Sequence, residues 1–185
     1  MKRITTLGKA LRVLSFYRWA FGDLTEADSD IGLLAEYLVG DLLGCLPPTR
    51  KEQAPFDLIM KDGTTIEVKA AAHKYCGRGR TPSYRWDVKT QKQCIRGNRP
   101  IADIWLFLMA DFPREDSRSP RTFQAFDLRF WTCYATTGQT LRALNRTSNI
   151  YESALCGIGL APFPLAKLSP TMFTALRSTE KHILR

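Results

Sequence analysis

The sequence lacks any long apolar run. Its apolar stretches have the length of a β-strand, and no window approaches the ~18 uninterrupted apolar residues of a membrane-spanning helix. Residues 1–21 mix five basic side chains (Lys2, Arg3, Lys9, Arg12 and Arg18) among apolar residues and contain no small-residue cleavage site. This stretch predicts an amphipathic helix over residues 5–20, and neither a secretion signal nor a membrane partner is expected.

Paired cysteine motifs are also missing. The five cysteines form an odd set without a short CxxC pair, which argues against a secreted disulfide framework and favours a reducing cytoplasm. His73 and Cys76 are spaced like half of a zinc site, with Cys94 as a distant third ligand. The sequence offers no fourth ligand, so zinc is the lesser expectation.

Acidic residues are fewer than basic ones, and the formal net charge is +9. Residues 74–99 alone contain eight basic residues against one acidic residue, Asp87, a net charge of +7. Such clustering indicates a polyanionic partner, because Lys and Arg release the counterions condensed on phosphates. The alternative is a solvated surface without a partner. The eight predicted nucleic-acid contacts are Lys74, Arg78, Arg80, Arg85, Lys89, Lys92, Arg96 and Arg99.

No internal repeat or low-complexity segment divides the 185 residues, so we expect one domain. Within it, residues 1–24 form an N-terminal helix, 25–135 a core and 136–185 a C-terminal helical segment. Apolar residues recur at helical spacing from Leu33 up to Gly44, which predicts a helix. A tight turn joins two predicted strands over residues 56–70. Further strands are predicted at 84–88, at 104–110 with both faces buried, and at 130–134 along an edge. Residues 111–120 predict a loop, and residues 138–144 and 170–183 predict helices. The fold class is α/β with a mixed sheet flanked by helices.

The turn sets the register of the first two strands. If Lys61-Asp62-Gly63 forms a three-residue loop with Gly63 in the left-handed conformation, Met60 pairs with Thr64 and Asp57 lies opposite Glu67. Their Cβ atoms are then about 5 Å apart, and Lys69 shares the face of Glu67. A two-residue loop would instead pair Asp57 with Val68 and split this group.

Two adjacent carboxylates repel each other unless a cation lies between them. Carboxylates, a backbone carbonyl and water suit Mg²⁺, with Mn²⁺ as a substitute, so we expect Asp57, Glu67 and the Val68 carbonyl to bind the metal. Lys69 would orient a water or stabilise the transition state, and Glu36, on the helix expected to pack on the hairpin, would assist. The alternative is that these charges lie on an exposed hairpin face.

The order of these residues resembles that of the PD-(D/E)XK nuclease superfamily. The segments that carry the resemblance are 32–39, 56–58, 66–71, 102–107 and 131–134, which are also similar to a poorly characterised bacterial group within it. The resemblance implies a restriction endonuclease-like αβββαβ core, metal binding by Asp57 and Glu67, a catalytic Lys69 and an assisting Glu36. The sequence departs from the pattern at Phe56, which separates Pro55 from Asp57, and at 72–78, where that group carries a Gln-Ser-Trp stretch.

Together these features predict a magnesium-dependent DNA endonuclease, although RNA is not distinguished as a substrate. A small nuclease that cuts both DNA strands often needs a homodimer, but the sequence does not specify the oligomeric state. Tyr75, Tyr84 and Trp86 either stack on unpaired bases or belong to the core. Two alternatives remain open. The chain is a nucleic-acid-binding module without cleavage, or a subunit of a restriction or defence assembly that uses its N-terminal helix and residues 111–121 as a contact surface.

Overall fold

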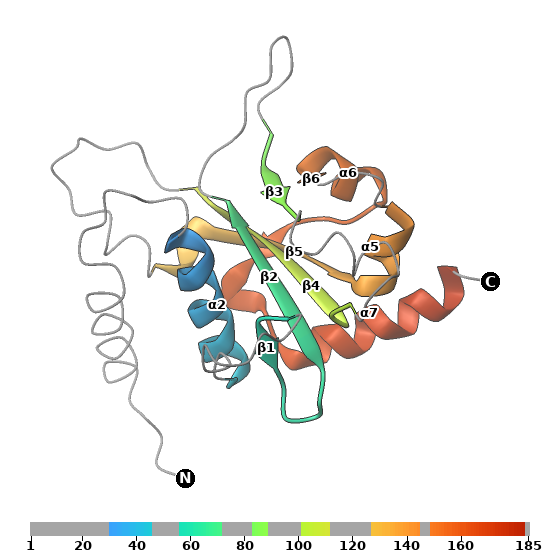
Figure 1. Cartoon of the computed structure of the whole chain (residues 1–185), viewed down its shortest axis with the longest axis horizontal. Helices are drawn as coiled ribbons and strands as arrows, with labels where there is room; N and C mark the ends of the chain where they lie inside the picture. The colour runs from blue at the N-terminus through green and yellow to red at the C-terminus, as the bar shows by residue number, and fades with distance from the viewer. Residues whose placement is uncertain are drawn as a thin grey trace, which may run out of the picture.

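The computed structural model describes residues 30–45, 56–71, 83–88, 101–111, 127–144 and 149–183. These residues form a five-stranded mixed sheet in the order β1-β2-β4-β5-β7, a two-stranded ribbon of β3 and β6, and four α-helices (Figure 1). The predicted α/β class with a mixed sheet is therefore confirmed. The strands are β1 (Leu58–Ile59), β2 (Thr65–Ala71), β3 (Arg85–Asp87), β4 (Ile104–Ala110), β5 (Trp131–Thr137), β6 (Asn149–Tyr151) and β7 (Phe163–Pro164). The helices are α2 (Asp30–Leu43), α5 (Gly138–Leu144), α6 (Glu152–Gly157) and α7 (Pro170–Ile183), with short 3-10 helices η2 (Leu128–Phe130) and η3 (Leu165–Lys167).

Strand β4 occupies the centre of the sheet. All seven of its residues are buried, as its continuous apolar run predicted. It pairs in parallel with β2 and antiparallel with β5. Because side chains alternate along a strand, β4 supplies two separate cores, one on each face of the sheet.

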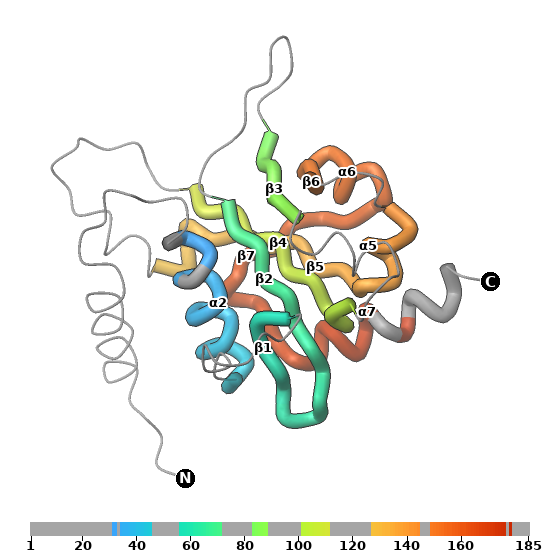
Figure 2. The backbone as a smooth tube through the Cα atoms, viewed as in Figure 1, coloured from blue at the N-terminus to red at the C-terminus, as the bar shows by residue number. Residues whose placement is uncertain are grey.

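The two cores are covered by different elements. One lies between the sheet and helices α2 and α7, and includes Val39, Val68 and Phe173. The other lies under the β3–β6 ribbon, α5 and α6, and includes Trp86 and Phe107. We call these the helix-side face and the ribbon-side face of the sheet. Figure 2 shows β3 next to β6 at one end of the sheet, with α2 on the other side of β2.

The predicted hairpin register is confirmed. Leu58 pairs with Ile66 and Ile59 with Thr65, and the Met60 N–H donates to the Thr64 carbonyl at 2.9 Å. Gly63 has a φ of 84°, the left-handed conformation that a three-residue loop requires at this position. The Asp62 side chain accepts the Thr64 N–H at 2.9 Å and so stabilises the turn.

Three features differ from the sequence-based expectation. Strand β5 is not at an edge, because Thr132 and Cys133 pair with Pro164 and Phe163 of β7. Strand β3 forms close to its predicted bounds, but it pairs with β6 and not with the main sheet. Trp86 and Ile150 of this ribbon bury their side chains on the sheet, so packing and not strand pairing holds it there. Strands β6 and β7 and helix α6 had no clear signal in the sequence.

The helices that were predicted after the hairpin are observed as α5 and α7, and the helix before it as α2. The N-terminal helix expected over 5–20 lies outside the described residues, as does the loop expected over 111–120 except for Asp111. No helix in the described part of the chain has both the length and the apolar character needed to cross a bilayer.

Replacing Gly63 with Ala tests the turn on which the register depends. A Cβ at a φ of 84° costs about 1–2 kcal/mol, so we expect the free energy of unfolding to fall by about that amount in a urea titration. Gly157→Ala is the matched control, because a Cβ there meets no atom within 4 Å and Gly157 lies in a helix. An equal effect of both substitutions would contradict the strained turn.

Candidate active site

Strand β2 carries Glu67 and Lys69 on the ribbon-side face. Its residues Glu67 and Lys69 lie beside Trp105 and Phe107 of β4, whose rings belong to the ribbon-side core. Glu67 is only 1% exposed, whereas Lys69 is half-buried. The Lys69 Nζ donates to Glu67 Oε1 and forms an ion pair with it. The two residues therefore form one charged unit inside an otherwise apolar sheet.

Asp57 immediately precedes β1 at the outer edge of β2. Its N–H donates to the Ile66 carbonyl at 2.9 Å, which continues the hairpin by one residue. Its Oδ2 accepts the Val68 N–H at 2.7 Å, a short charge-assisted hydrogen bond. This bond fixes the Asp57 carboxylate at the edge of β2, between the positions of Glu67 and Lys69 along the strand.

The same bond orients the Val68 carbonyl. Within a strand, the N–H and C=O of one residue point to the same side, because a hydrogen-bonded pair exchanges both bonds with one neighbour. The Val68 N–H points to Asp57, so its carbonyl is also directed to this edge. The sequence suggested Val68 only as a source of a carbonyl and gave no sign that its N–H would hold Asp57.

Glu36 approaches this group from α2. The helix packs its buried residues Leu34, Ala35 and Val39 on the helix-side face, and Glu36 is half-buried beside them. Burial, followed by the negative charge of Asp57, raises the pKa of Glu36 to about 8, while Lys69 opposes the shift. Glu36 therefore lies within electrostatic reach of Asp57, Glu67 and Lys69.

The remaining titratable groups respond to the same environment. Burial raises the pKa of Asp57 above its ordinary value, although Lys69 and the Val68 N–H both act to lower it. Burial alone would lower the pKa of Lys69, but the negative charges of Glu67 and Asp57 outweigh it, so that pKa is raised. Lys69 thus stays protonated at neutral pH and partly neutralises the carboxyl groups around it.

The donor set fits a hard divalent cation. Asp57, Glu67 and the Val68 carbonyl offer only oxygen, and Mg²⁺ typically uses one or two carboxylates and keeps several waters. Among the described residues, no three His, Cys, Asp or Glu side chains are arranged as a ready-made metal cluster. A cation at this edge would therefore depend on two carboxylates, and it would compete with Lys69 for Glu67 Oε1.

The structure describes one of the eight predicted nucleic-acid contacts. Arg85 is exposed on β3, and the other seven lie outside the described residues. Tyr84 and Trp86, considered as base-stacking residues, are 5% and 1% exposed. The core alternative is correct for both, because they pack in the ribbon-side core. The strand alternates exposed, buried, exposed, so its outward face carries Arg85 and Asp87.

His73, Cys76 and Cys94 of the zinc alternative lie outside the described residues.

Asp103 links two strands of the main sheet. It accepts both the N–H and the hydroxyl of Thr65 at 2.9 Å, and it thereby ties the start of β2 to the start of β4.

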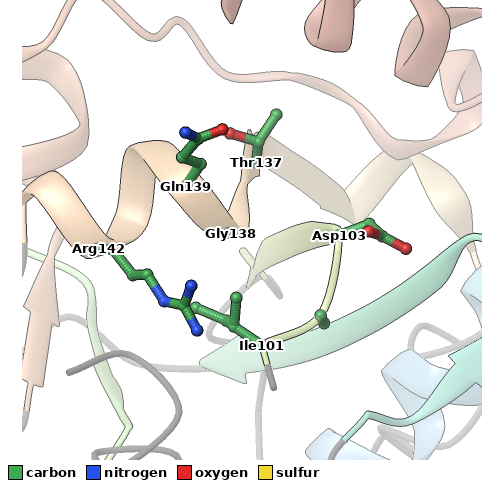
Figure 3. A pocket seen from close by; sticks show the side chains of 7 residues that line it. Ile101, Asp103, Thr137, Gly138, Gln139 and Arg142 are labelled. Carbon is green, nitrogen blue, oxygen red and sulfur yellow. The ribbon is translucent and has the colours of Figure 1, made fainter. Parts of the chain in front are cut away.

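A cavity of about 340 Å³ lies at this end of the sheet, between the start of β4 and the start of α5. Figure 3 shows Arg142 next to Ile101, with Asp103 on the far side and turned away from the guanidinium. Glu36, Asp57, Glu67 and Lys69 do not line this cavity. It is therefore separate from the candidate active site.

Comparisons of the chain with protein-family models and with curated proteins found no match. The assignment of the site therefore depends on its own geometry.

The pKa of Glu36 gives a test of the metal-free site. A carboxyl group whose pKa is raised in the folded state stabilises that state at low pH, and this contribution is lost as the pH rises from about 4.5 to about 8. In EDTA, we expect the free energy of unfolding to fall less with rising pH in the Glu36→Gln chain than in the parent chain. Urea titrations at several pH values measure this free energy.

The matched control is Asp41→Asn, which removes an exposed carboxyl group from the same helix. It gives the baseline for the removal of a carboxyl group from α2. If Glu36→Gln changes the pH dependence no more than Asp41→Asn does, Glu36 is not buried among like charges as described.

Proposed function

We propose that the chain is a metal-dependent nuclease that hydrolyses phosphodiester bonds, with DNA as the substrate and internal cleavage as the mode. One observation carries the proposal: Asp57, which precedes the Leu58–Ile66 pair, is held by the Val68 N–H, between Glu67 and Lys69 along β2. Burying four ionisable groups in and around a sheet edge is costly unless they have a use or full compensation. A phosphodiesterase site provides that use.

The residues have separate tasks in this proposal. Asp57, Glu67 and the Val68 carbonyl hold Mg²⁺, which when bound polarises the phosphodiester and lowers the pKa of a bound water. Lys69, still protonated, orients the attacking water and stabilises negative charge that develops on the phosphate. Glu36, with a pKa of about 8, is mostly neutral at pH 7 and limits the repulsion between the carboxyl groups.

The fold supports the proposed nuclease class. A helix precedes a hairpin whose first strand follows the Asp and whose second strand carries Glu-Val-Lys, and a buried strand then runs parallel to the second. This part of the order agrees with what the resemblance to PD-(D/E)XK nucleases implies, whereas the third strand, β3, pairs with β6 outside the main sheet. The restriction endonuclease-like core is part of the proposal. A homodimer would allow both DNA strands to be cut, and it too remains a proposal.

Charge supports a nucleic-acid substrate. Strand β3 lies at the middle of the basic stretch 74–99, and Trp86 anchors it to β4 through an N–H bond to the Leu108 carbonyl at 2.9 Å. Trp86 also contacts Phe107, with ring centroids 5.2 Å apart, and Phe107 is the neighbour of Lys69 in the sheet. Strand β3, a described part of the basic stretch, is thus attached to the face that carries the candidate catalytic residues.

Cleavage assays test the site directly. We expect the chain to cut supercoiled and linear DNA in Mg²⁺ or Mn²⁺ but not in EDTA, and Glu67→Gln and Lys69→Ala each to lower the rate by about 100-fold or more. Asp41→Asn and Lys167→Ala, two exposed positions that belong neither to the hairpin nor to the candidate active site, should retain the parent rate. RNA is assayed in parallel. Cleavage that survives both active-site substitutions would refute the assignment.

A second candidate function has one observation in its favour. The Lys69 ammonium already contacts Glu67, and no three-ligand cluster exists among the described residues, as expected of a binding module that has lost cleavage. Such a module would bind nucleic acid in EDTA as well as in Mg²⁺ and would cut neither DNA nor RNA. The cleavage assay separates the two functions.

Binding is measured on the Glu67→Gln chain by fluorescence anisotropy with a labelled DNA duplex. Arg85→Ala in this background should weaken binding several-fold and reduce the slope of log affinity against log salt by about 1, because one phosphate contact is lost. Lys167→Ala removes an exposed basic residue from the opposite side of the sheet and should change neither quantity. Equal losses from both would indicate a general charge effect and not a contact at β3.

A further inference from the structure

Trp105 of β4 is the exception among the buried tryptophans. Its side chain is fully buried, yet its Nε1 has no hydrogen-bond acceptor among the described residues. Trp86, buried on the same face, donates its Nε1 to the Leu108 carbonyl at 2.9 Å. A buried donor without an acceptor costs about 1–3 kcal/mol and is rare in folded proteins. We therefore expect the indole N–H of Trp105 to gain a hydrogen-bond acceptor when the protein is in its functional state.

Sheet register places this donor beside the candidate active site. Trp105 is the partner of Glu67 in the parallel β2–β4 pair, and neighbouring strands are about 4.8 Å apart. Both side chains are on the ribbon-side face, and both are almost completely shielded from water. The Trp105 ring also stacks on Phe107, with centroids 6.1 Å apart, and Phe107 is the partner of Lys69. The indole of Trp105 therefore packs on the same face of the sheet as Glu67 and Lys69.

The hydrogen bond between Lys69 and Glu67 indicates when Glu67 would instead accept the indole N–H of Trp105. Glu67 Oε1 accepts a hydrogen bond from Lys69, an arrangement suited to the metal-free site. A divalent cation that binds Glu67 competes with the Lys69 ammonium, so the carboxylate has to change its contacts. An indole N–H donates only, so it neither binds the cation nor titrates. It can, however, hold one carboxylate oxygen while the other binds the metal.

We propose that Trp105 is a positioning residue, whose indole N–H donates to the Glu67 carboxylate when that carboxylate turns from Lys69 to a bound divalent cation. The inference rests on the proposed function, because it assumes that Glu67 is a metal ligand. Partners of this kind orient ligating carboxylates, and their loss typically lowers metal affinity or activity by about 10-fold to 100-fold.

The first test is a nuclear magnetic resonance titration that requires no catalysis. The chain has four tryptophans, so the ¹⁵N-labelled protein gives four indole N–H signals, and Trp105→Phe identifies one of them. We expect this signal to shift downfield as Mg²⁺ or Ca²⁺ is added, and not to shift in the Glu67→Gln chain. Trp131, fully buried on the helix-side face, is the internal control and should not move. If the chemical shift of the Trp105 indole N–H does not change when the cation is added, the proposal is overturned.

The second test separates positioning from packing. Trp105→Phe retains an aromatic ring but removes the donor, and it should raise the Mg²⁺ concentration for half-maximal cleavage by about 10-fold to 100-fold with an unchanged KM for DNA. Trp131→Phe, the matched core substitution, should leave the Mg²⁺ requirement unchanged. If both substitutions alter stability but neither alters the Mg²⁺ requirement, Trp105 only packs. If Trp105→Phe does not fold, Trp19→Phe, Trp86→Phe and Trp131→Phe assign the other three indole signals, and the titration of the parent chain then decides.

The two proposals fail in different ways. Cleavage that depends on Glu67, together with a Trp105 signal that does not respond to the cation, refutes the positioning role and retains the nuclease. A cation-dependent Trp105 signal without cleavage of DNA or RNA refutes the nuclease but supports the link between Trp105, Glu67 and the metal. If the chain does not cleave nucleic acid and the Trp105 signal does not shift, both proposals are refuted.

Discussion

The hydrogen bond from the Val68 N–H to Asp57 Oδ2 is the interaction on which the candidate site depends. It lies where the β1–β2 ladder ends. The Asp57 carboxylate there supplies the Val68 N–H with the acceptor that a further backbone pair would otherwise supply. The same bond supplies the half-buried Asp57 carboxylate with a donor and so reduces the cost of its burial. Strand pairing, charge burial and the geometry of the site are thus linked through one 2.7 Å contact.

The sheet around this contact is arranged to tolerate charge. On the helix-side face, β2 contributes Ile66 and Val68 to an apolar core, and on the ribbon-side face it presents Glu67 and Lys69. Lys69 offsets part of the negative charge, and the raised pKa of Glu36 removes more of it at neutral pH. The buried cluster is therefore less negative than its three carboxyl groups suggest, and it still offers oxygen ligands along one edge.

Local sequence patterns predicted the parts of the fold that depend on neighbours in the chain. The Lys61-Asp62-Gly63 turn and the alternation of β2 predicted the register, and the apolar run of β4 predicted its burial. The pairing of Arg85–Asp87 with Asn149–Tyr151 joins segments more than 60 residues apart, and periodicity has no information about such contacts. The burial of Trp86 follows from that long-range packing, so the sequence left it undecided. The Val68–Asp57 bond is local, but it depends on the orientation of the Asp57 side chain just before β1, which the strand register does not specify, so the sequence missed it.

The three-residue turn has a consequence for how this chain can change over evolution. Strand β2 is held by six register pairs to β4, so a residue gained or lost in the turn cannot easily move it. The shift would fall on β1 and would take Asp57 to the opposite face of the hairpin, away from Glu67. Every side chain of the candidate site would still be encoded, but the group would be divided. At residues 61–63, the number of residues is therefore constrained more strongly than the identity of Lys61, and insertions and deletions should be tolerated far less than substitutions there.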